Sequence, residues 1–134
     1  MAEKILYPSV EELKTLYDRI VRVSGGEHGY LSMSNLEYLL DTVKDVGERL
    51  AKRQAIIKKA AFLLYNVVVV HPFLNGNKRT AFELAKLFLK ANGFGLKVDV
   101  KETYSFLLRL ASGDASESEA EEWLATHLTE SKSD

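Results

Sequence analysis

Small, basic and amide-bearing residues crowd into one short stretch of the sequence, residues 71–79, which read HPFLNGNKR. Backbone N–H groups at a helix start carry partial positive charge, and Gly76 lets that backbone approach an anion without side-chain obstruction. Lys78 and Arg79 add two full charges in the same turn, and an arginine guanidinium can bind phosphate oxygens through two parallel hydrogen bonds. The stretch therefore predicts a polyphosphate site.

His71 lies at the other end of this stretch, and imidazole is the side chain that exchanges protons near neutral pH. A base beside bound phosphates suits transfer of a phosphorus-containing group to a hydroxyl, because the base activates the oxygen while fixed charges stabilise the phosphoryl group. Phe73 is expected to point into the core and hold the loop. Taken singly, a histidine before proline is more often a residue that merely ends a helix, and a Lys-Arg pair more often lies on a solvated helix face. The hypothesis of a phosphate-transfer site therefore depends on the spacing of these residues together.

Two helices are expected to flank these residues. Between residues 49 and 70 the apolar positions broaden until the helix is apolar almost all round, which is typical of a central helix. Its last four residues, 67–70, are valines and could equally form a buried strand, but no alternation or partner strand signal flanks them. His71 precedes a proline and should end the helix. The second helix begins beyond Asn77 and is expected to end at Asn92 and Gly93.

Capping patterns predict four further helices, with caps expected at Ser9, Ser34, Asp99 and Ser116. Residues 94–98 are expected to be extended, and the chain after Thr129 is expected to fray. Few strand signals remain, so we expect an all-α bundle in which a central helix-loop-helix carries residues 71–79. Its length of 134 residues suits one domain, 1–134.

The glycine-rich segment from Gly25 to Tyr30 is expected to be a linker or a flap, and as a flap it could form a short β element that docks a target segment. His28 in this segment and His127 near the end of the last helix are expected on the surface. The aromatic residues at helical spacing are assigned to core packing, namely Phe62, Tyr65, Phe88, Phe94 and Phe106.

Composition excludes several classes of function. Lys and Arg number 18 against 19 Asp and Glu, so no net basic field favours nucleic acid. Cysteine is absent, which excludes disulfides and thiol nucleophiles and favours a reducing, cytoplasmic compartment. The start lacks the pattern of a signal peptide, and the apolar run 60–70 falls short of the ~20 residues that span a bilayer, so no membrane association is expected.

Residues 71–79 resemble the signature of the Fic/Doc family, His-x-Phe-x-(Asp/Glu)-(Gly/Ala)-Asn-(Lys/Gly)-Arg, and residues 77–81 resemble its Doc (death-on-curing) form. The resemblance implies the Fic/Doc helical fold and ATP as co-substrate. It implies roles for six residues: His71 as the catalytic histidine, Phe73 as the buried anchor, Gly76 and Asn77 as anion-hole positions, and Lys78 and Arg79 as the pair that engages ATP phosphates.

The resemblance also implies an activity and a partner. Doc toxins move a phosphoryl group to a threonine of elongation factor Tu and are silenced by a separate antitoxin, whereas Fic enzymes usually transfer AMP. The leading interpretation is a Doc-like toxin that phosphorylates a hydroxyl of a target protein. The alternatives are a Fic-type AMP or UMP transferase and a catalytically silent module that binds nucleotide or peptide.

Two residues depart from the family pattern. Asn75 stands where the family generally has an acidic residue that binds magnesium, so Asn75 is the candidate metal ligand but brings no negative charge. Phe82 stands where the Fic form has its last arginine, which favours the Doc branch. The inhibitory motif of self-regulated Fic proteins has its nearest miss from Thr126 to Ser131, so an internal inhibitor is not expected.

Overall fold

The computed structural model describes residues 4–130, which form six α-helices, one 3-10 helix and two short strands. The helices are α1 (Val10–Ser24), α2 (Met33–Thr42), α3 (Lys52–Val70), α4 (Asn77–Ala91), α5 (Val100–Ser112) and α6 (Glu117–His127). The 3-10 helix η1 spans Val43–Asp45, and the strands are β1 (Phe94–Leu96) and β2 (Leu128–Glu130). The fold is the helical one that the sequence predicts.

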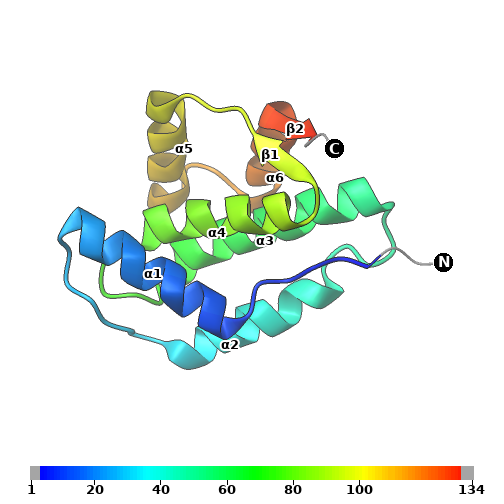
Figure 1. Ribbon diagram of the computed structural model, residues 1–134. Helices are drawn as coiled ribbons and strands as arrows, with labels where there is room; N and C mark the ends of the chain where they lie inside the picture. The colour runs from blue at the N-terminus through cyan, green and yellow to red at the C-terminus, as the bar shows by residue number, and fades with distance from the viewer. Residues whose placement is uncertain (1–3, 131–134) are drawn as a thin grey trace.

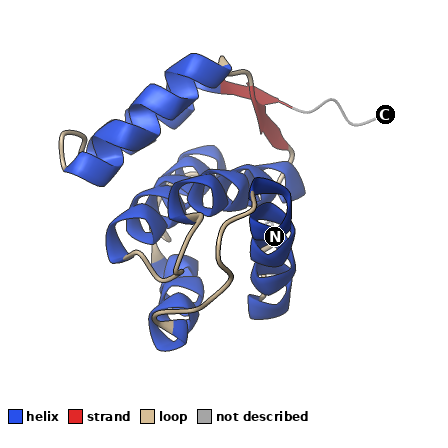
Figure 2. Ribbon diagram, turned by 90° about the vertical axis from the view of Figure 1, so that its left-hand side faces the viewer, coloured by secondary structure: helices blue, strands red, loops and turns tan. Residues whose placement is uncertain are grey.

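The helices are arranged around a central pair. α3 and α4 pack side by side through the middle of the molecule, with α1 and α2 on one side of them and α5 and α6 on the other (Figure 1). The two strands lie at one edge of the molecule, next to an otherwise helical body (Figure 2). Residues 71–76 form the loop between these two central helices, and residues 77–79 form the start of α4.

Lys59 is the one charged side chain buried inside α3. Its Nζ donates hydrogen bonds to the carbonyl oxygens of Val43 (3.1 Å), Lys44 (3.0 Å) and Val46 (2.6 Å). Burial lowers the pKa of Lys59, while the neighbouring carboxylates of Asp45 and then Glu48 act in the opposite direction. The lysine satisfies carbonyl groups in and after η1 and so ties this turn to the central helix.

Local capping signals place most helix starts correctly. Ser9 and Ser116 form complete capping boxes, and Asp99 caps α5 through the Glu102 N–H. The predicted cap at Ser34 is wrong. The Ser32 side chain accepts from the Asn35 N–H instead, and α2 begins at Met33, directly after Ser32. The reason is tertiary, since the Ser32 N–H is bonded to the Pro72 carbonyl oxygen at 3.1 Å and this contact fixes where the chain turns into the helix.

The expectation that the chain frays after Thr129 is wrong for Glu130. Thr129 and Glu130 belong to β2, which pairs antiparallel with β1 in the register Phe94↔Glu130, Gly95↔Thr129 and Leu96↔Leu128. The pairing joins segments far apart in the sequence, so no local pattern could reveal it. Residues 131–134, the rest of the predicted tail, lie outside the described residues.

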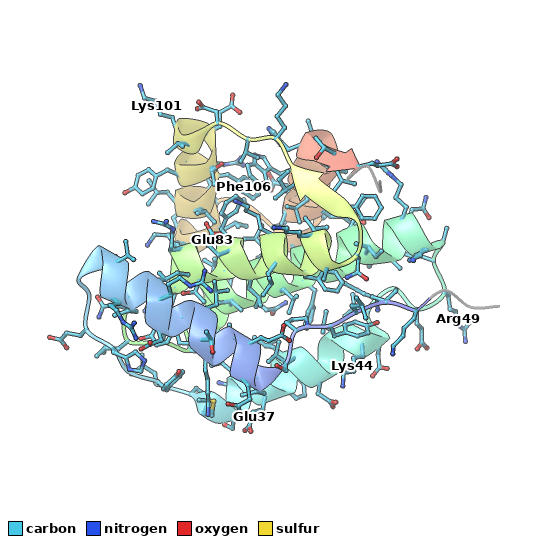
Figure 3. All side chains as sticks on the ribbon, in the orientation of Figure 1. Glu37, Lys44, Arg49, Glu83, Lys101 and Phe106 are labelled. Carbon is cyan, nitrogen blue, oxygen red and sulfur yellow. The ribbon has the colours of Figure 1, made fainter. Side chains whose placement is uncertain are left out.

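An aromatic stack joins α5 to α6. The rings of Phe106 and Trp123 are parallel, with centroids 4.8 Å apart, and Phe106 points from α5 toward α6 (Figure 3). His127 packs on Trp123 and is partly buried, with 20% of its side chain exposed. His28 lies at the surface as expected, with 46% of its side chain exposed. Within residues 4–130 no helix has both the length and the apolar character needed to cross a membrane.

Candidate active site

His71 ends α3 in a left-handed backbone conformation, with φ 57° and ψ 57°. Its N–H donates to the Val67 carbonyl oxygen at 3.2 Å, while its side chain is exposed. A residue other than glycine rarely adopts this conformation, and such backbone strain is concentrated at functional sites. The helix therefore ends abruptly at the histidine, and the chain turns directly into the loop that precedes α4.

Phe73 anchors this loop in the core. Its side chain is fully buried and stacks on the ring of Tyr17 from α1, with centroids 4.0 Å apart and planes 17° apart. Stacked aromatic pairs of this kind contribute about 1 kcal/mol beyond the area they bury. The anchor fixes the loop between His71 and the start of α4.

Asn77, the first residue of α4, is buried and uses its side chain within the loop. Its Oδ1 accepts from the Phe73 N–H at 2.9 Å, and its Nδ2 donates to the Phe73 carbonyl oxygen at 2.8 Å. An anion can therefore meet the main-chain N–H groups of the first turn of α4 but not the Asn77 amide. Gly76 precedes this turn with φ 77°, a left-handed conformation that favours glycine.

A pocket of about 820 Å³ opens beside the loop. Residues 74–78 line it, together with His71. Lys78 lines the pocket, whereas Arg79 does not, and the Arg79 Nε lies 3.8 Å from Glu83 Oε2 on the exposed face of α4. The structure thus brings His71, Asn75, Gly76 and Lys78 together and leaves the arginine side chain outside the lining.

The turn between α5 and α6 also lines the pocket, although no motif in the sequence marks it as part of a site. Asp114, Ser116 and Glu119 line it. Arg109 braces this turn by donating to Glu119 Oε2 at 2.8 Å and to the Asp114 carbonyl oxygen at 3.3 Å. The hydrogen bond from the Ser116 backbone and then the pairing with Arg109 hold the pKa of Glu119 below its usual range. These residues lie far from 71–79 in the sequence, so no spacing signal could have found them.

The glycine-rich segment lies against the same loop. Tyr30 and Phe73 form an antiparallel bridge, the Leu31 N–H donates to the Pro72 carbonyl oxygen at 2.7 Å, and the Leu74 N–H donates to the Gly29 carbonyl oxygen at 2.8 Å. The predicted flap is therefore a loop joined to residues 72–74 by this single bridge, and it is separate from the β1–β2 sheet.

Comparison with known proteins agrees with this geometry. A model described as the Fic/DOC family matches residues 7–89, which include α1 to α3, the whole loop and α4 as far as Leu89. The chain belongs to the Fic/DOC family. That description covers Fic and Doc members alike, and the match ends before α5.

Two relatives of this Fic/DOC chain are called protein adenylyltransferase fic-1. The one from Caenorhabditis elegans is 34% identical over 83 residues, covering 57% of this chain and 16% of the relative. The one from Caenorhabditis briggsae is 35% identical over 80 residues, covering 58% of this chain and 16% of the relative. The chain thus matches only 16% of the length of these relatives.

The family pattern implies a magnesium ion, and the residues of this chain do not fit one. Asn75, at the position expected to bind the metal, is exposed and offers only an uncharged amide oxygen. Among residues 4–130 no group of three or more His, Asp or Glu side chains could hold a metal ion. Magnesium in proteins is usually held by one or two carboxylates, which the Asn75 position does not supply.

Proposed function

We propose that this Fic/DOC domain transfers a phosphorus-containing group from ATP to a hydroxyl of another protein. The observation that carries the proposal is a single pocket, about 820 Å³ in volume, lined by His71, Gly76, Asn77 and Lys78. Such a volume lies within the range of about 300–1,000 Å³ typical of small-molecule sites. One base, one cation and one helix N-terminus face the same space.

The chemistry follows from these groups. The His71 imidazole accepts the proton of the target hydroxyl, and the oxygen attacks phosphorus as the bond to the leaving phosphate breaks. The N–H groups at the start of α4 and the Lys78 ammonium stabilise the charge on the phosphate oxygens. Asp114 and Glu119, which also line the pocket, disfavour a phosphate beside them and so favour placing the triphosphate next to Lys78.

Phosphoryl transfer, which releases ADP, is the form that the site favours. Phe82 occupies the position of the last arginine of the Fic motif, and here it is buried with its ring against Trp123. A phosphate contact from that position is therefore absent, as in Doc-type members. A Doc-type role as a toxin, with a separate antitoxin, belongs to the same proposal.

Adenylyl transfer, which releases pyrophosphate, is the second candidate because both relatives are called adenylyltransferases. The same base and the same phosphate-binding groups would serve either reaction. The two differ only in which phosphorus of ATP the hydroxyl attacks.

The target segment is proposed to dock on the edge of the glycine-rich loop. Hydrogen bonds at Gly29 and Leu31 flank the Tyr30–Phe73 pair, so the main-chain N–H and carbonyl of Tyr30 point away from Phe73. Neither group makes a hydrogen bond within residues 4–130. An extended peptide can add to such an edge through its own main chain.

The test is incubation of the protein and a cell lysate with ATP labelled at either the α or the γ phosphate. Label from the γ position on a protein band supports phosphoryl transfer, and label from the α position supports adenylyl transfer. ATP binding without label transfer from either position would contradict the proposal and favour a silent binding module. His71→Asn in parallel reports transfer that does not need the base.

A further inference from the structure

Tyr17 of α1 contacts two parts of the site with two parts of one side chain. Its ring stacks on Phe73, 4.0 Å between centroids, and its hydroxyl reaches the glycine-rich loop. The hydroxyl donates to the Gly29 carbonyl oxygen and accepts from the Gly29 N–H, both at 2.9 Å. Tyr17 is fully buried and does not line the pocket, so it does not meet ATP there.

Gly29 is therefore a junction of three segments. Its carbonyl oxygen also accepts from the Leu74 N–H at 2.8 Å, so α1, the glycine-rich loop and the motif loop meet at one residue. A Cβ on Gly29 would lie 3.3 Å from the Leu74 Cβ, closer than most such contacts. The absence of a side chain at Gly29 permits this close approach.

The junction determines where the open edge at Tyr30 lies relative to His71. Tyr30 follows Gly29 directly, and Leu74 is three residues beyond His71. With the hydroxyl present, Gly29 is held from one side by Tyr17 and from the other by Leu74. Without it, the Gly29 N–H loses its partner, and the loop keeps its hydrogen bonds to residues 72–74 and the packing of His28 and Tyr30 on the Tyr17 ring.

We infer that Tyr17 is a positioning residue for the protein substrate: its hydroxyl holds the glycine-rich loop so that a docked segment presents its hydroxyl to His71. This inference rests on the proposed function. It assigns Tyr17 a role in binding the protein target and none in binding ATP. The ring of Tyr17 supports the motif loop, and the hydroxyl supports the docking loop.

The test separates these two roles of the side chain. Tyr17→Phe keeps the ring on Phe73 and removes the hydroxyl. Tyr7→Phe is the matched control, because Tyr7 also stacks on a phenylalanine, Phe88 at 5.9 Å, and its hydroxyl makes no hydrogen bond within residues 4–130. The readouts are KM and kcat for the protein target that the label experiment identifies, the ATP dissociation constant, and amide hydrogen exchange.

For Tyr17→Phe we expect KM for the target to rise about tenfold, as loss of two hydrogen bonds would predict, with kcat and ATP affinity within about twofold of the wild type. The amides of Gly29, Leu31 and Ser32 should exchange faster, while those of α3 keep their protection. Tyr7→Phe should change none of these values. A purely structural role would instead weaken ATP binding, raise KM and lower the protection of amides throughout the protein from exchange.

Unchanged exchange at Gly29 in Tyr17→Phe would overturn the inference, as would faster exchange with an unchanged KM. If Tyr17→Phe does not fold, Gly29→Ala provides the second variant, because its methyl group pushes the loop from Leu74 without touching α1. The same rise in KM is then expected, and an unchanged KM would overturn the inference. If the wild type transfers no label, the proposed function fails, and exchange in the Phe variant still decides whether the hydroxyl holds the loop.

Discussion

The side-chain amide of Asn77 is bonded at both ends to the main chain of Phe73, at 2.9 Å to its N–H and at 2.8 Å to its carbonyl oxygen. The first residue of α4 thereby closes the loop that carries the site. The amide of Asn77 is occupied, and the anion-binding capacity of this turn belongs to the main chain and to Lys78. The Asn77 side chain therefore stabilises the loop and does not bind the anion.

Asn77→Ala should lower the free energy of unfolding by about 2–4 kcal/mol, because two buried backbone groups lose their partners. Urea unfolding monitored by circular dichroism measures it. Asn35→Ala, at an exposed position on α2, is the control and should change the value by less than about 0.5 kcal/mol. A loss below about 1 kcal/mol in Asn77→Ala would show that the loop closes without this amide.

His71→Asn should lower label transfer at least about a hundredfold, since a general base contributes that much or more. Asparagine tolerates the left-handed backbone of His71, so the melting temperature should stay within about 3 °C of the wild type. Label transfer and thermal melts are measured on one preparation. His127→Asn, at a residue that does not line the pocket, should retain transfer. A folded His71→Asn protein with full transfer would remove His71 from the mechanism.

Lys78→Met should weaken ATP binding about tenfold, and Arg79→Met by less than about threefold. Lys78 lines the pocket, whereas Arg79 is turned toward Glu83, so the structure reverses the order that bidentate binding by arginine suggests from sequence. Isothermal titration calorimetry with ATP measures both constants. Greater loss in Arg79→Met would mean that the arginine turns into the pocket when ATP binds.

Asn75→Asp tests the position where the chain departs from the Fic/DOC pattern. The added carboxylate supplies the ligand type that magnesium prefers, so transfer should rise at low magnesium and the gain should shrink as magnesium is raised. Transfer is measured across a magnesium titration, with Asn75→Asp combined with His71→Asn as the control. No change at any magnesium concentration, with ATP still bound, would show that the missing carboxylate does not limit this protein.

Glu119→Gln should lower the melting temperature at pH 7, because the neutral glutamine amide cannot form the ion pair that Glu119 makes with Arg109. The pKa of Glu119 is lowered in the folded state, so its contribution to stability is fully present above the ordinary value of 4.5 and is lost as the pH falls through the folded pKa. The melting temperature of the variant should therefore be lower than that of the wild type at pH 7 and equal to it at strongly acidic pH. Glu122→Gln, exposed on the same helix, is the control.

The sequence by itself predicted the helices and pointed to residues 71–79 as the candidate site. Capping boxes at Ser9 and Ser116 and the left-handed Gly93 act over three or four residues, so they can be recognised without knowing what lies across the molecule. The spacing of residues 71–79 predicted a family to which the chain belongs. Local hydrogen bonding and helical periodicity are properties of neighbouring residues, which is why these predictions were possible.

Tertiary structure alone decided how the site is closed and held. Ser32 rather than Ser34 caps α2, because the Pro72 carbonyl oxygen accepts from the Ser32 N–H. Glu130, which was expected to fray, belongs to β2 because β1 supplies a partner strand. The Asp114 wall of the pocket and the Tyr17–Gly29 bonds likewise join segments that are distant in sequence. Such contacts depend on how packed helices bring side chains together in space, and no spacing within one segment encodes that geometry.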